Sequence, residues 1–462
     1  MSFELDNNLP QNWGITTIGE LTLPYQTAQP KKEPETEFKY VDIGSIDNNT
    51  NTITNPKTFL GKDAPSRARR IVAKGDILFS TVRTYLKNIA RVSDDLDGIL
   101  TSTGIAVLRA SFAVDSNFLF YFVLSDKFIR NISSAMDGTL YPAVTDSDVA
   151  SAKIPLPPLN EQKRIVGKIE ALQRRSQRVK EAIDAIPQLL DQFRQSVLAA
   201  AFRGDLTADW RENNPDVEPA SVLLEKIRAE RRRKWEEAEL EKMKAKGKVP
   251  KDDKWKQKYK EPEAVDDSNL PELPDGWCWG IVELICSDIV DCPHSTAKYT
   301  EKGKIIVRTS DFRVGRLDLS QTKFVSEETF EQRVKRLRPK KGDVLYSREG
   351  GIFGIACLVS DTEICMGQRM MLLRAEKNFY EEKLLMWLMN SPQIFGQAKS
   401  KVIGTASPHV NVADIKRFYI PIPPLKEQRD IVFKIQQYWF TIESIEKQLL
   451  SQYLCQNKSV KR

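Results

Sequence analysis

One stretch of this chain is written twice, and this duplication constrains the fold more than any other feature. The segment IPLPPLNEQKRIVGKIEAL at residues 154–172 returns 266 residues later as IPIPPLKEQRDIVFKIQQY at residues 420–438. Its prolines fix φ and cannot continue a helix, so each copy predicts an extended segment followed at once by a helix. Solenoid repeats have units of a few tens of residues, and a period this long instead predicts one module present twice.

Behind each proline signature, apolar residues recur in alternating steps of four and three. The stripe includes Ile165, Ile169, Leu172, Val179 and Ile183 in the first copy, and Ile431, Ile435, Tyr438, Ile442, Ile445 and Leu449 in the second. A spacing of 3.5 residues narrows the apolar face of a helix to a seam that packs against another helix. We therefore expect the two helices to pair; alternatively, each packs separately on its own domain. Pro187 predicts a kink or break near Ile186.

Other landmarks occur in the same order in both halves of the chain. They are an opening LPxxW at residues 9–13 and 273–277, a Lys-Gly-Asp turn and strand at 74–83 and 341–350, a second strand ending at 110 and 375, and an aromatic-rich helix at 118–125 and 380–389. Strands and few helices without a regular β-α-β rhythm predict an α+β domain of about 150 residues. Outside the landmarks the copies diverge, which fits two surfaces for different targets, or simple drift.

These markers predict four parts of the chain. They are a first module at residues 1–159, a central helical region with a charged linker at 160–267, a second module at 268–425 and a distal helix at 426–462. The central region contains a very charged helix from about Ser221 with a basic block at residues 231–234. Residues 246–267 are polar and contain two prolines, and we expect them to form a linker.

Composition narrows the class of protein. The 462 residues are 29% charged with a formal net charge of +7, which permits a polyanionic partner. No apolar run approaches the roughly 18 residues needed to span a bilayer, and no signal pattern opens the chain, so we expect a cytoplasmic protein without a membrane segment. The six cysteines form no CxxC pair, and Cys286, Cys292 and His294 are interpreted as structural residues, with no metal site.

The motifs of common enzymes are missing from the sequence. It contains no GxxxxGK[ST] phosphate loop, no HExxH and no GxSxG. It also lacks the Asn-Pro-Pro-aromatic and Asp-Pro-Pro-aromatic tetrapeptides, which argues against base methylation by this chain. The pattern favours a binding protein without a catalytic site of its own.

Basic residues next to small polar ones are the candidates for DNA contact. Arginine suits phosphate contacts and, at a guanine edge, bidentate base readout. Taken singly, each is also explained as an ordinary solvated surface charge. The candidates are Arg67, Arg69, Arg70, Arg83 and Lys87 in the first module and Arg336, Arg338 and Arg348 in the second.

With the duplication, the seam and the charged connector in place, the chain resembles the DNA-specificity subunit of type I restriction-modification systems. The resemblance covers nearly the whole chain and rests on the twin signatures IPLPPLNEQKRIV and IPIPPLKEQRDIV. AAFRGDLTADWR at residues 200–211 and EPASVLLEKIRAER at 218–231 look like the central region of that family.

The resemblance implies a function. Each module would be a target recognition domain that reads one half of a split sequence in double-stranded DNA, and the two helices would pair antiparallel as a coiled coil. The chain would be no enzyme and hold no cofactor. It would recruit two methyltransferase subunits, which modify adenine with S-adenosylmethionine, and restriction subunits that use ATP and magnesium. Residues 160–178, 426–437 and 202–210 would be docking surfaces.

Two points remain open at the level of the sequence. No FRG sequence follows the second helix, so the two docking surfaces are expected to be unequal. A structural adaptor that binds proteins through two modules is the alternative function.

A helix over residues 160–203 would be at most about 65 Å long. Such helices could act as a ruler, and inserting one heptad into both would then lengthen the preferred DNA spacer.

Overall fold

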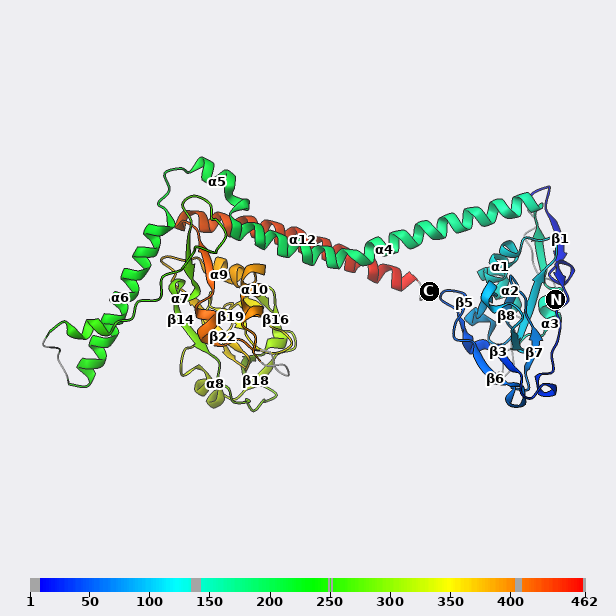
Figure 1. The fold of residues 1–462 in the computed structure, drawn as a ribbon, viewed down its shortest axis with the longest axis horizontal. Helices are drawn as coiled ribbons and strands as arrows, with labels where there is room; N and C mark the ends of the chain where they lie inside the picture. The colour runs from blue at the N-terminus through cyan, green and yellow to red at the C-terminus, as the bar shows by residue number, and fades with distance from the viewer. Residues whose placement is uncertain (1–8, 134–142, 248–249, 251, 404–408, 460–462) are drawn as a thin grey trace. The chain divides into compact units, whose positions relative to one another are not determined.

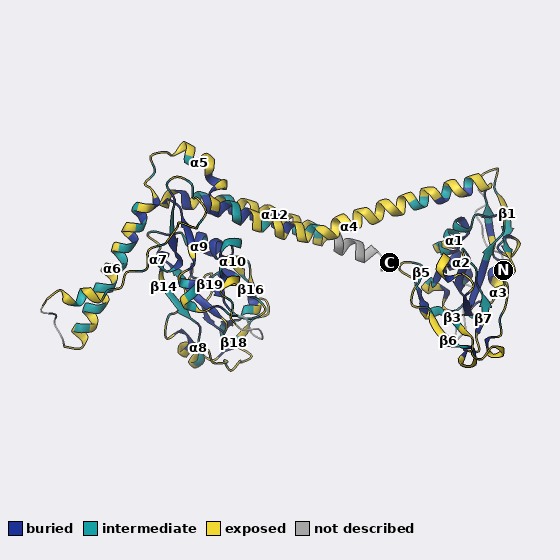
Figure 2. Ribbon diagram, viewed as in Figure 1, coloured by how far each residue is buried: buried dark blue, intermediate teal, exposed yellow. Residues whose placement is uncertain are grey.

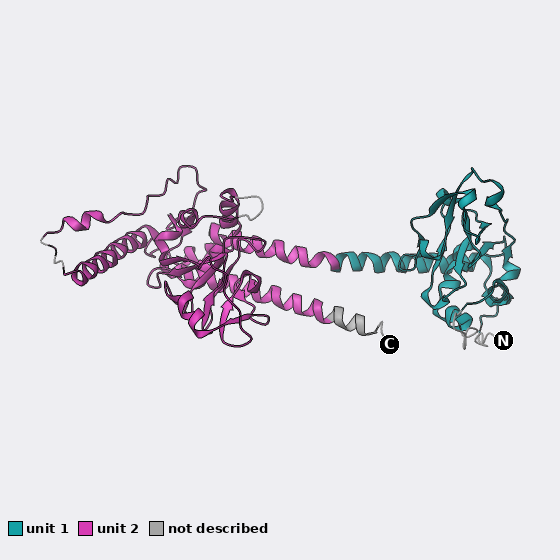
Figure 3. Ribbon diagram, turned by 90° about the horizontal axis from the view of Figure 1, so that it is seen from below, with its two compact units in different colours: residues 1–183 teal, residues 184–462 magenta. Residues whose placement is uncertain are grey.

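The computed structural model describes residues 9–133, 143–247, 250, 252–403 and 409–459, and for residues 452–459 the helical backbone alone. The chain divides into two compact units, residues 1–183 and 184–462 (Figure 3). Unit 1 contains the first module, and unit 2 contains the second module with the central region and the distal helix. Each module is α+β, as the sequence predicts (Figure 1).

Module 1 contains a two-stranded ladder and two four-stranded sheets. The ladder joins β1 (Gly14–Thr17) antiparallel to β12 (Lys153–Leu156), which brings the two ends of the module together. The sheets have the orders β2-β11-β8-β9 and β6-β3-β10-β7, and β3 and β10 are parallel. The bounds are β2 (Thr22–Leu23), β3 (Glu37–Val41), β6 (Lys57–Leu60), β7 (Ala68–Ile71), β8 (Ile77–Ser80), β9 (Ile89–Arg91), β10 (Leu100–Ser102) and β11 (Ile105–Ala110).

Helices cover the sheet that contains β8. Helices α1 (Ser116–Leu124) and α2 (Asp126–Ser133) bury Leu119 and Phe128 in one apolar core with Phe79 of β8. The rings of Phe79 and Phe128 meet edge to face with centroids 5.8 Å apart. A short hairpin, β4 (Ile46–Asp47) with β5 (Thr52–Ile53), and helix α3 (Asp146–Ser151) complete the module.

Module 2 repeats this topology. Its ladder is β13–β23, its main sheet is β14-β22-β19-β20, and a second sheet, β18-β15-β21, again has a parallel pair in β15 and β21. A hairpin, β16–β17, corresponds to β4–β5. The strand bounds are β13 (Cys278–Ile281), β14 (Cys286–Asp291), β15 (Lys304–Val307), β16 (Phe312–Arg313), β17 (Arg316–Leu317), β18 (Lys323–Val325), β19 (Val344–Ser347), β20 (Ala356–Leu358), β21 (Ile364–Met366), β22 (Met370–Ala375) and β23 (Tyr419–Ile422). The helices are α7 (Val282–Ile285), α8 (Glu327–Val334), α9 (Glu382–Met389), α10 (Pro392–Ser400) and α11 (Val412–Lys416).

The Lys-Gly-Asp landmark forms the same ion pair in both modules. Asp76 accepts from Arg109 Nη2 at 2.8 Å, and Asp343 accepts from Arg374 Nη2 at 2.7 Å. Both carboxylates are buried, and hydrogen bonding to them raises the pKa of each arginine above its ordinary value. The pair ties the turn before the first strand of the repeat to the end of the second strand, which explains why both sequences occur together.

The glutamine of each proline signature anchors the long helix to its module. Gln162 accepts the backbone N–H of Asp115 at 2.7 Å and donates to the carbonyl of Pro157 at 2.8 Å. Gln428 likewise accepts the N–H of Glu381 at 2.8 Å. Both glutamines are almost fully buried, so their hydrogen bonds satisfy groups that would be costly to leave unpaired.

Helices α4 (Leu159–Arg203) and α12 (Leu425–Ser459) pair antiparallel within unit 2 (Figure 1). Phe193 meets Tyr438 edge to face at 5.9 Å, and Arg194 donates to Glu446 at 2.7 Å. Further along α4, Leu198 lies in one apolar core with Ile431. Phe193 and Arg194 thus contact Tyr438 and Glu446, whereas Leu198, later on α4, shares a core with Ile431, earlier on α12. This order, with the course of the two helices in Figure 1, confirms the predicted antiparallel pairing.

The seam differs from the prediction in extent. Leu172, Val179 and Ile183 are 58%, 52% and 39% exposed, so the described residues do not cover these three positions of the predicted seam. Figure 2 shows a long exposed stretch of α4. The physical reason is that a heptad stripe does not specify its partner. Ile165 packs partly on the core of module 1, and Ile435 is buried in the core of module 2, so part of each stripe serves its own domain.

The other seam positions range from buried to exposed. Ile431, Ile435 and Ile442 are fully buried, whereas Tyr438 and Ile445 are 41% and 37% exposed, and Ile169 and Leu449 are half-buried. Helix α4 continues without interruption through Pro187, so the break considered near Ile186 does not occur.

The charged helix of the central region is α6 (Ala220–Ala245), close to the predicted start. The segment after it is more structured than a linker. Within it, the 3-10 turn Lys254–Lys258 carries Trp255, which stacks on Trp235 of α6 with ring centroids 6.1 Å apart. Tyr259 packs against the same Trp235 ring at 5.4 Å. The aromatic residues therefore fold part of the polar segment back onto the helix.

Candidate nucleic-acid interface

The loop after the Lys-Gly-Asp strand has left-handed residues at two equivalent positions in both modules. Between β8 and β9, Arg83 and Lys87 have φ of 50° and 53°, and between β19 and β20, Gly350 and Gly354 have φ of 89° and 78°. Glycine adopts this left-handed region freely, whereas another residue there costs on the order of 1–3 kcal/mol. Module 1 thus keeps two basic residues where the turn favours glycine, and such strained positions cluster at functional sites.

Hydrogen bonds from neighbouring elements hold the β8–β9 loop in place, and its tip is exposed. Asn48 Nδ2 donates to the carbonyl of Leu86 at 2.9 Å, and the hydroxyls of Thr84 and Ser133 lie 2.7 Å apart. The tip carries Arg83, which is exposed, and Tyr85, which is 55% exposed. On this fixed backbone, the arginine suits contact with phosphate groups and the aromatic ring suits contact with bases, as a nucleic acid offers.

The β4–β5 turn lies beside this loop and extends the surface. Asn48, Asn49, Thr50 and Thr52 are exposed, and Asn51 Nδ2 donates to the carbonyl of Ile89 at 3.1 Å. Asparagine and threonine side chains can hydrogen-bond base edges. Sequence reasoning missed this turn, although the run NNTNT at residues 48–52 was a visible signal.

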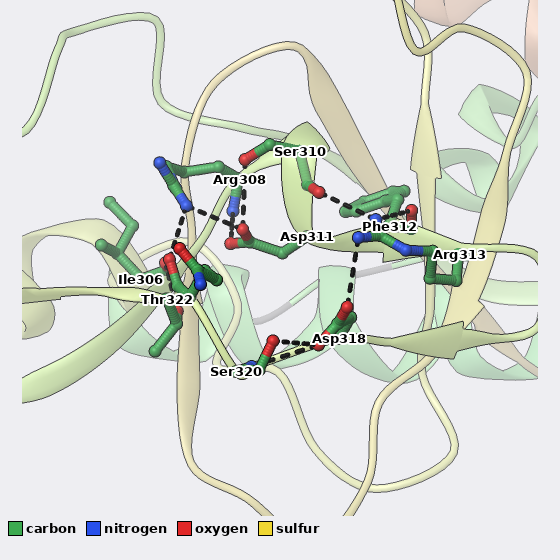
Figure 4. A network of polar contacts seen from close by, with 10 residues as sticks. Ile306, Arg308, Ser310, Asp311, Phe312, Arg313, Asp318, Ser320 and Thr322 are labelled. Atoms are coloured by element: carbon green, nitrogen blue, oxygen red, sulfur yellow. Dashed lines mark hydrogen bonds and ion pairs between the residues drawn. The ribbon is translucent and has the colours of Figure 1, made fainter. Parts of the chain in front are cut away.

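The corresponding turn of module 2 carries Arg313 and Arg316 instead, and Figure 4 shows the contacts of Arg313. Arg313 donates to the carbonyls of Ser310 and Phe312 at 2.9 and 2.8 Å and to Asp318 at 3.1 Å. The Ser320 hydroxyl holds Asp318 in place and lowers the pKa of its carboxyl. The Arg316 side chain is exposed and forms no hydrogen bond or ion pair with a residue that the structure describes.

Arg369 joins this surface from the residue before β22. It has a left-handed φ of 68°, is 55% exposed on its side chain, and lies 4.0 Å from Glu349. A Cβ at Gly350 would lie 3.3 Å from Arg369 Nη1, so the arginine extends over the β19–β20 loop. No sequence signal marks an arginine as left-handed, and it was not predicted.

Two of the predicted DNA contacts, Arg70 and Arg348, have side chains that are already engaged by acidic partners within their own modules. Arg70 donates to both oxygens of Asp146, at 3.1 and 2.5 Å, and its side chain is only 11% exposed. Arg348 donates to both oxygens of Asp291 at 3.0 Å and is 8% exposed. A guanidinium with little exposure needs such a partner, so Arg70 ties β7 to helix α3, and Arg348 ties the end of β19 to β14.

The remaining candidates fall into two groups. Lys87 forms an ion pair with Asp126, and Arg338 binds Glu331 and Glu363, so these two cations already have acidic partners. The side chains of the others are exposed and form no ion pair with a described residue. These are Arg67, Arg69, Arg83 and Arg336.

The described residues offer no metal centre. Among them, no group of three or more His, Cys, Asp or Glu side chains could hold a metal ion. Cys286 and Cys292 are buried free thiols whose pKa values are raised by burial, and His294 is exposed beside Asp291. No helix in the described ranges is long and apolar enough to cross a membrane.

Comparison with known proteins gives one family. The model of the type I restriction modification DNA specificity domain matches residues 10–188 and 291–452. The EcoKI specificity subunit of Escherichia coli K12 is 24% identical over 96% of this chain and 85% of its own length. The EcoDI specificity subunit of Escherichia coli is 29% identical over 48% of this chain, and the match spans 50% of that protein.

Solved structures agree in fold. The HsdS subunit from Thermoanaerobacter tengcongensis is 30% identical, with 96% of this chain and 94% of that one covered and a TM-score of 0.58. A chain from a structural study of complex assembly in a type I restriction-modification system is 29% identical, with 96% and 94% covered and a TM-score of 0.54.

Proposed function

The chain belongs to the family of specificity subunits of type I restriction-modification systems, and on this premise we propose that it binds double-stranded DNA sequence-specifically without catalysing a reaction itself. Each module would read one half of a bipartite, asymmetric target. The surfaces we assign to this role are the β8–β9 loop with the β4–β5 turn in module 1, and the β19–β20 loop with the β16–β17 turn and Arg369 in module 2.

The observation that carries the proposal is that the two modules share their buried contacts, whereas the exposed residues on their loops differ. Both modules share the buried ion pair, the glutamine anchor and the left-handed loop positions. The exposed residues on these loops nevertheless differ, with Arg83, Tyr85 and an Asn-Thr turn in one module and Arg316 and Arg369 in the other. A shared framework that holds different polar side chains at equivalent loop positions suits two domains that recognise different base pairs.

Partner subunits would dock on the long helices. We propose two methyltransferase subunits, which supply adenine methylation with S-adenosylmethionine, and restriction subunits that use ATP and magnesium. Leu159 and Leu425, which are 266 residues apart, are 42% and 43% exposed at the starts of α4 and α12. Phe433 and Phe440 on α12 are 57% and 74% exposed. Such exposed apolar residues support an interaction surface.

The test is to co-express this chain with the methyltransferase subunit of its own system and to map methylated adenines by long-read sequencing. The proposal expects one bipartite motif with a fixed gap, whose spacer lengthens when one heptad is inserted into both helices. A complex that forms without producing any motif would contradict sequence-specific binding. Binding that does not weaken with added salt would instead favour the protein adaptor.

A further inference from the structure

The base of α12 in module 2 is covered by a segment of the central region, residues 202–211. The carboxylate of Glu427 is fully buried beneath it. Glu427 Oε1 accepts from Thr207 at 2.6 Å and from Arg211 Nη1 at 2.7 Å, and Oε2 accepts from Trp277 Nε1 at 2.8 Å. The Arg211 guanidinium also lies over the Trp277 ring, 5.8 Å from its centroid.

A second polar contact and a close fit complete this covered site. Lys434 donates to both oxygens of Asp209, at 2.7 and 2.9 Å. Phe202 is buried in the core of unit 2. Gly204 has a φ of 84°, and a Cβ there would lie 2.4 Å from Pro274 Cγ, so the turn of the segment sits directly on the module. Arg211, Thr207 and Asp209 of the covering segment therefore bind a surface formed by Trp277, Glu427 and Lys434.

Module 1 presents the same receiving residues, and no segment within the described ranges covers them as residues 202–211 cover Glu427. Trp13 Nε1 donates to Glu161 Oε2 at 3.2 Å, as Trp277 does to Glu427. Here the Glu161 side chain is 29% exposed, and among the described residues its other oxygen contacts Arg164, whose side chain is 79% exposed. Lys168, the counterpart of Lys434, is exposed and pairs with no acid among the described residues.

We infer that Trp13, Glu161 and Lys168 form a docking site for a segment of a second polypeptide chain, one that presents an arginine and an acidic residue spaced like Arg211 and Asp209. The charges are complementary, because Glu161 would receive the guanidinium and Lys168 the carboxylate. The filled site of module 2 shows which geometry satisfies both. This inference deepens the proposed assembly with partner subunits and rests on it for the source of the segment.

A peptide tests the site without DNA or any partner subunit. A fluorescein-labelled peptide of residues 200–214 is titrated with the full-length chain, and binding is followed by fluorescence anisotropy. We expect saturable binding that weakens about tenfold or more with Glu161→Gln, or when the peptide carries Arg211→Ala, because each change removes a charge-assisted hydrogen bond.

Exchanging the two charges of one ion pair between the chain and the peptide separates loss of binding at this site from loss of folding. Lys168 is exposed, so Lys168→Glu should leave the fold intact, weaken the binding of the natural peptide and restore it for a peptide with Asp209→Lys. Lys163→Glu, on an exposed position of the same helix, is the matched control and should not discriminate between the two peptides.

Three results would overturn the inference. They are no saturable binding up to about 1 mM, a range that covers even weak docking, binding that neither Glu161→Gln nor Lys168→Glu changes, and an equal response to Lys163→Glu. None of these results depends on DNA recognition, so failure here is distinct from failure of the proposed function.

Discussion

The two modules differ in their exposed loops and share the buried contacts that hold each module together. Asp76 with Arg109 and Asp343 with Arg374 form the same pair, although the sequences around them have little else in common. In contrast, the loop that each pair supports has basic residues in one module and glycines in the other. A buried ion pair demands specific chemistry, whereas an exposed turn demands only a backbone geometry, so the loops were free to diverge.

The largest expected effect comes from breaking the shared ion pair. Asp343→Ala would leave the largely covered Arg374 side chain with the more distant Asp288 carboxylate, 3.8 Å away, and should destabilise module 2 by about 3–5 kcal/mol. Asp76→Ala should cost somewhat less, because the Arg109 side chain is 25% exposed and that of Arg374 only 12%. Hydrogen–deuterium exchange in increasing urea reports each module separately. A cost below about 1 kcal/mol would mean that the pair behaves like a surface salt bridge.

The next comparison sets the covered helix base against the open one. Glu427→Gln would disturb three hydrogen bonds to a buried carboxylate and should cost about 2–4 kcal/mol in unit 2. Glu161→Gln should cost well under about 1 kcal/mol in unit 1, since that carboxylate is partly solvated. Thermal unfolding of the two variants checks this difference. Equal costs would indicate that Glu161 is also covered.

The repeat made much of this fold predictable. The Lys-Gly-Asp turns, with Gly75 and Gly342 at φ of 82° and 89°, and the strands β11 and β22 lie where the sequence puts them, because local turn chemistry and apolar runs fix them. The pairing of α4 with α12 was predicted from a stripe of period 3.5, which favours a partner helix, and its antiparallel direction was implied by the family resemblance.

The sequence failed where partners are distant in the chain. Arg70 and Arg348 were predicted to contact DNA, but Asp146 and Asp291, their ion-pair partners, lie 76 and 57 residues away, so burial could not be read from neighbouring residues. The same limit hid the covering of Glu427 by residues 202–211. A heptad stripe also cannot specify whether a helix, a domain or solvent faces each turn, which is why Leu172 was expected to be buried.

The DNA-reading loops can be compared through single arginines. Arg83→Ala should relax the half of the target read by module 1, with a loss of about 1–3 kcal/mol in binding, and should leave the other half unchanged. Arg369→Ala should do the reverse. Lys153→Ala, which removes an exposed charge from β12, is the control. Methylation motifs mapped for each variant give the result, and a uniform loss over both halves would mean that these arginines contact phosphates only.

The smallest effect separates strain from recognition at Arg83. Arg83→Gly and Arg83→Ala remove the same guanidinium, so both should weaken DNA binding alike. Only glycine relieves the left-handed backbone at this position, and glycine also raises the entropy of the unfolded chain. The balance should leave the glycine variant about 1 kcal/mol more stable than the alanine variant. In module 2, Gly350→Ala should lose a similar amount, because its φ is 89°. Urea unfolding monitored by hydrogen exchange measures both differences. If alanine and glycine at residue 83 are equally stable, the loop of module 1 carries no backbone strain, and its basic residues are retained there without a cost to folding.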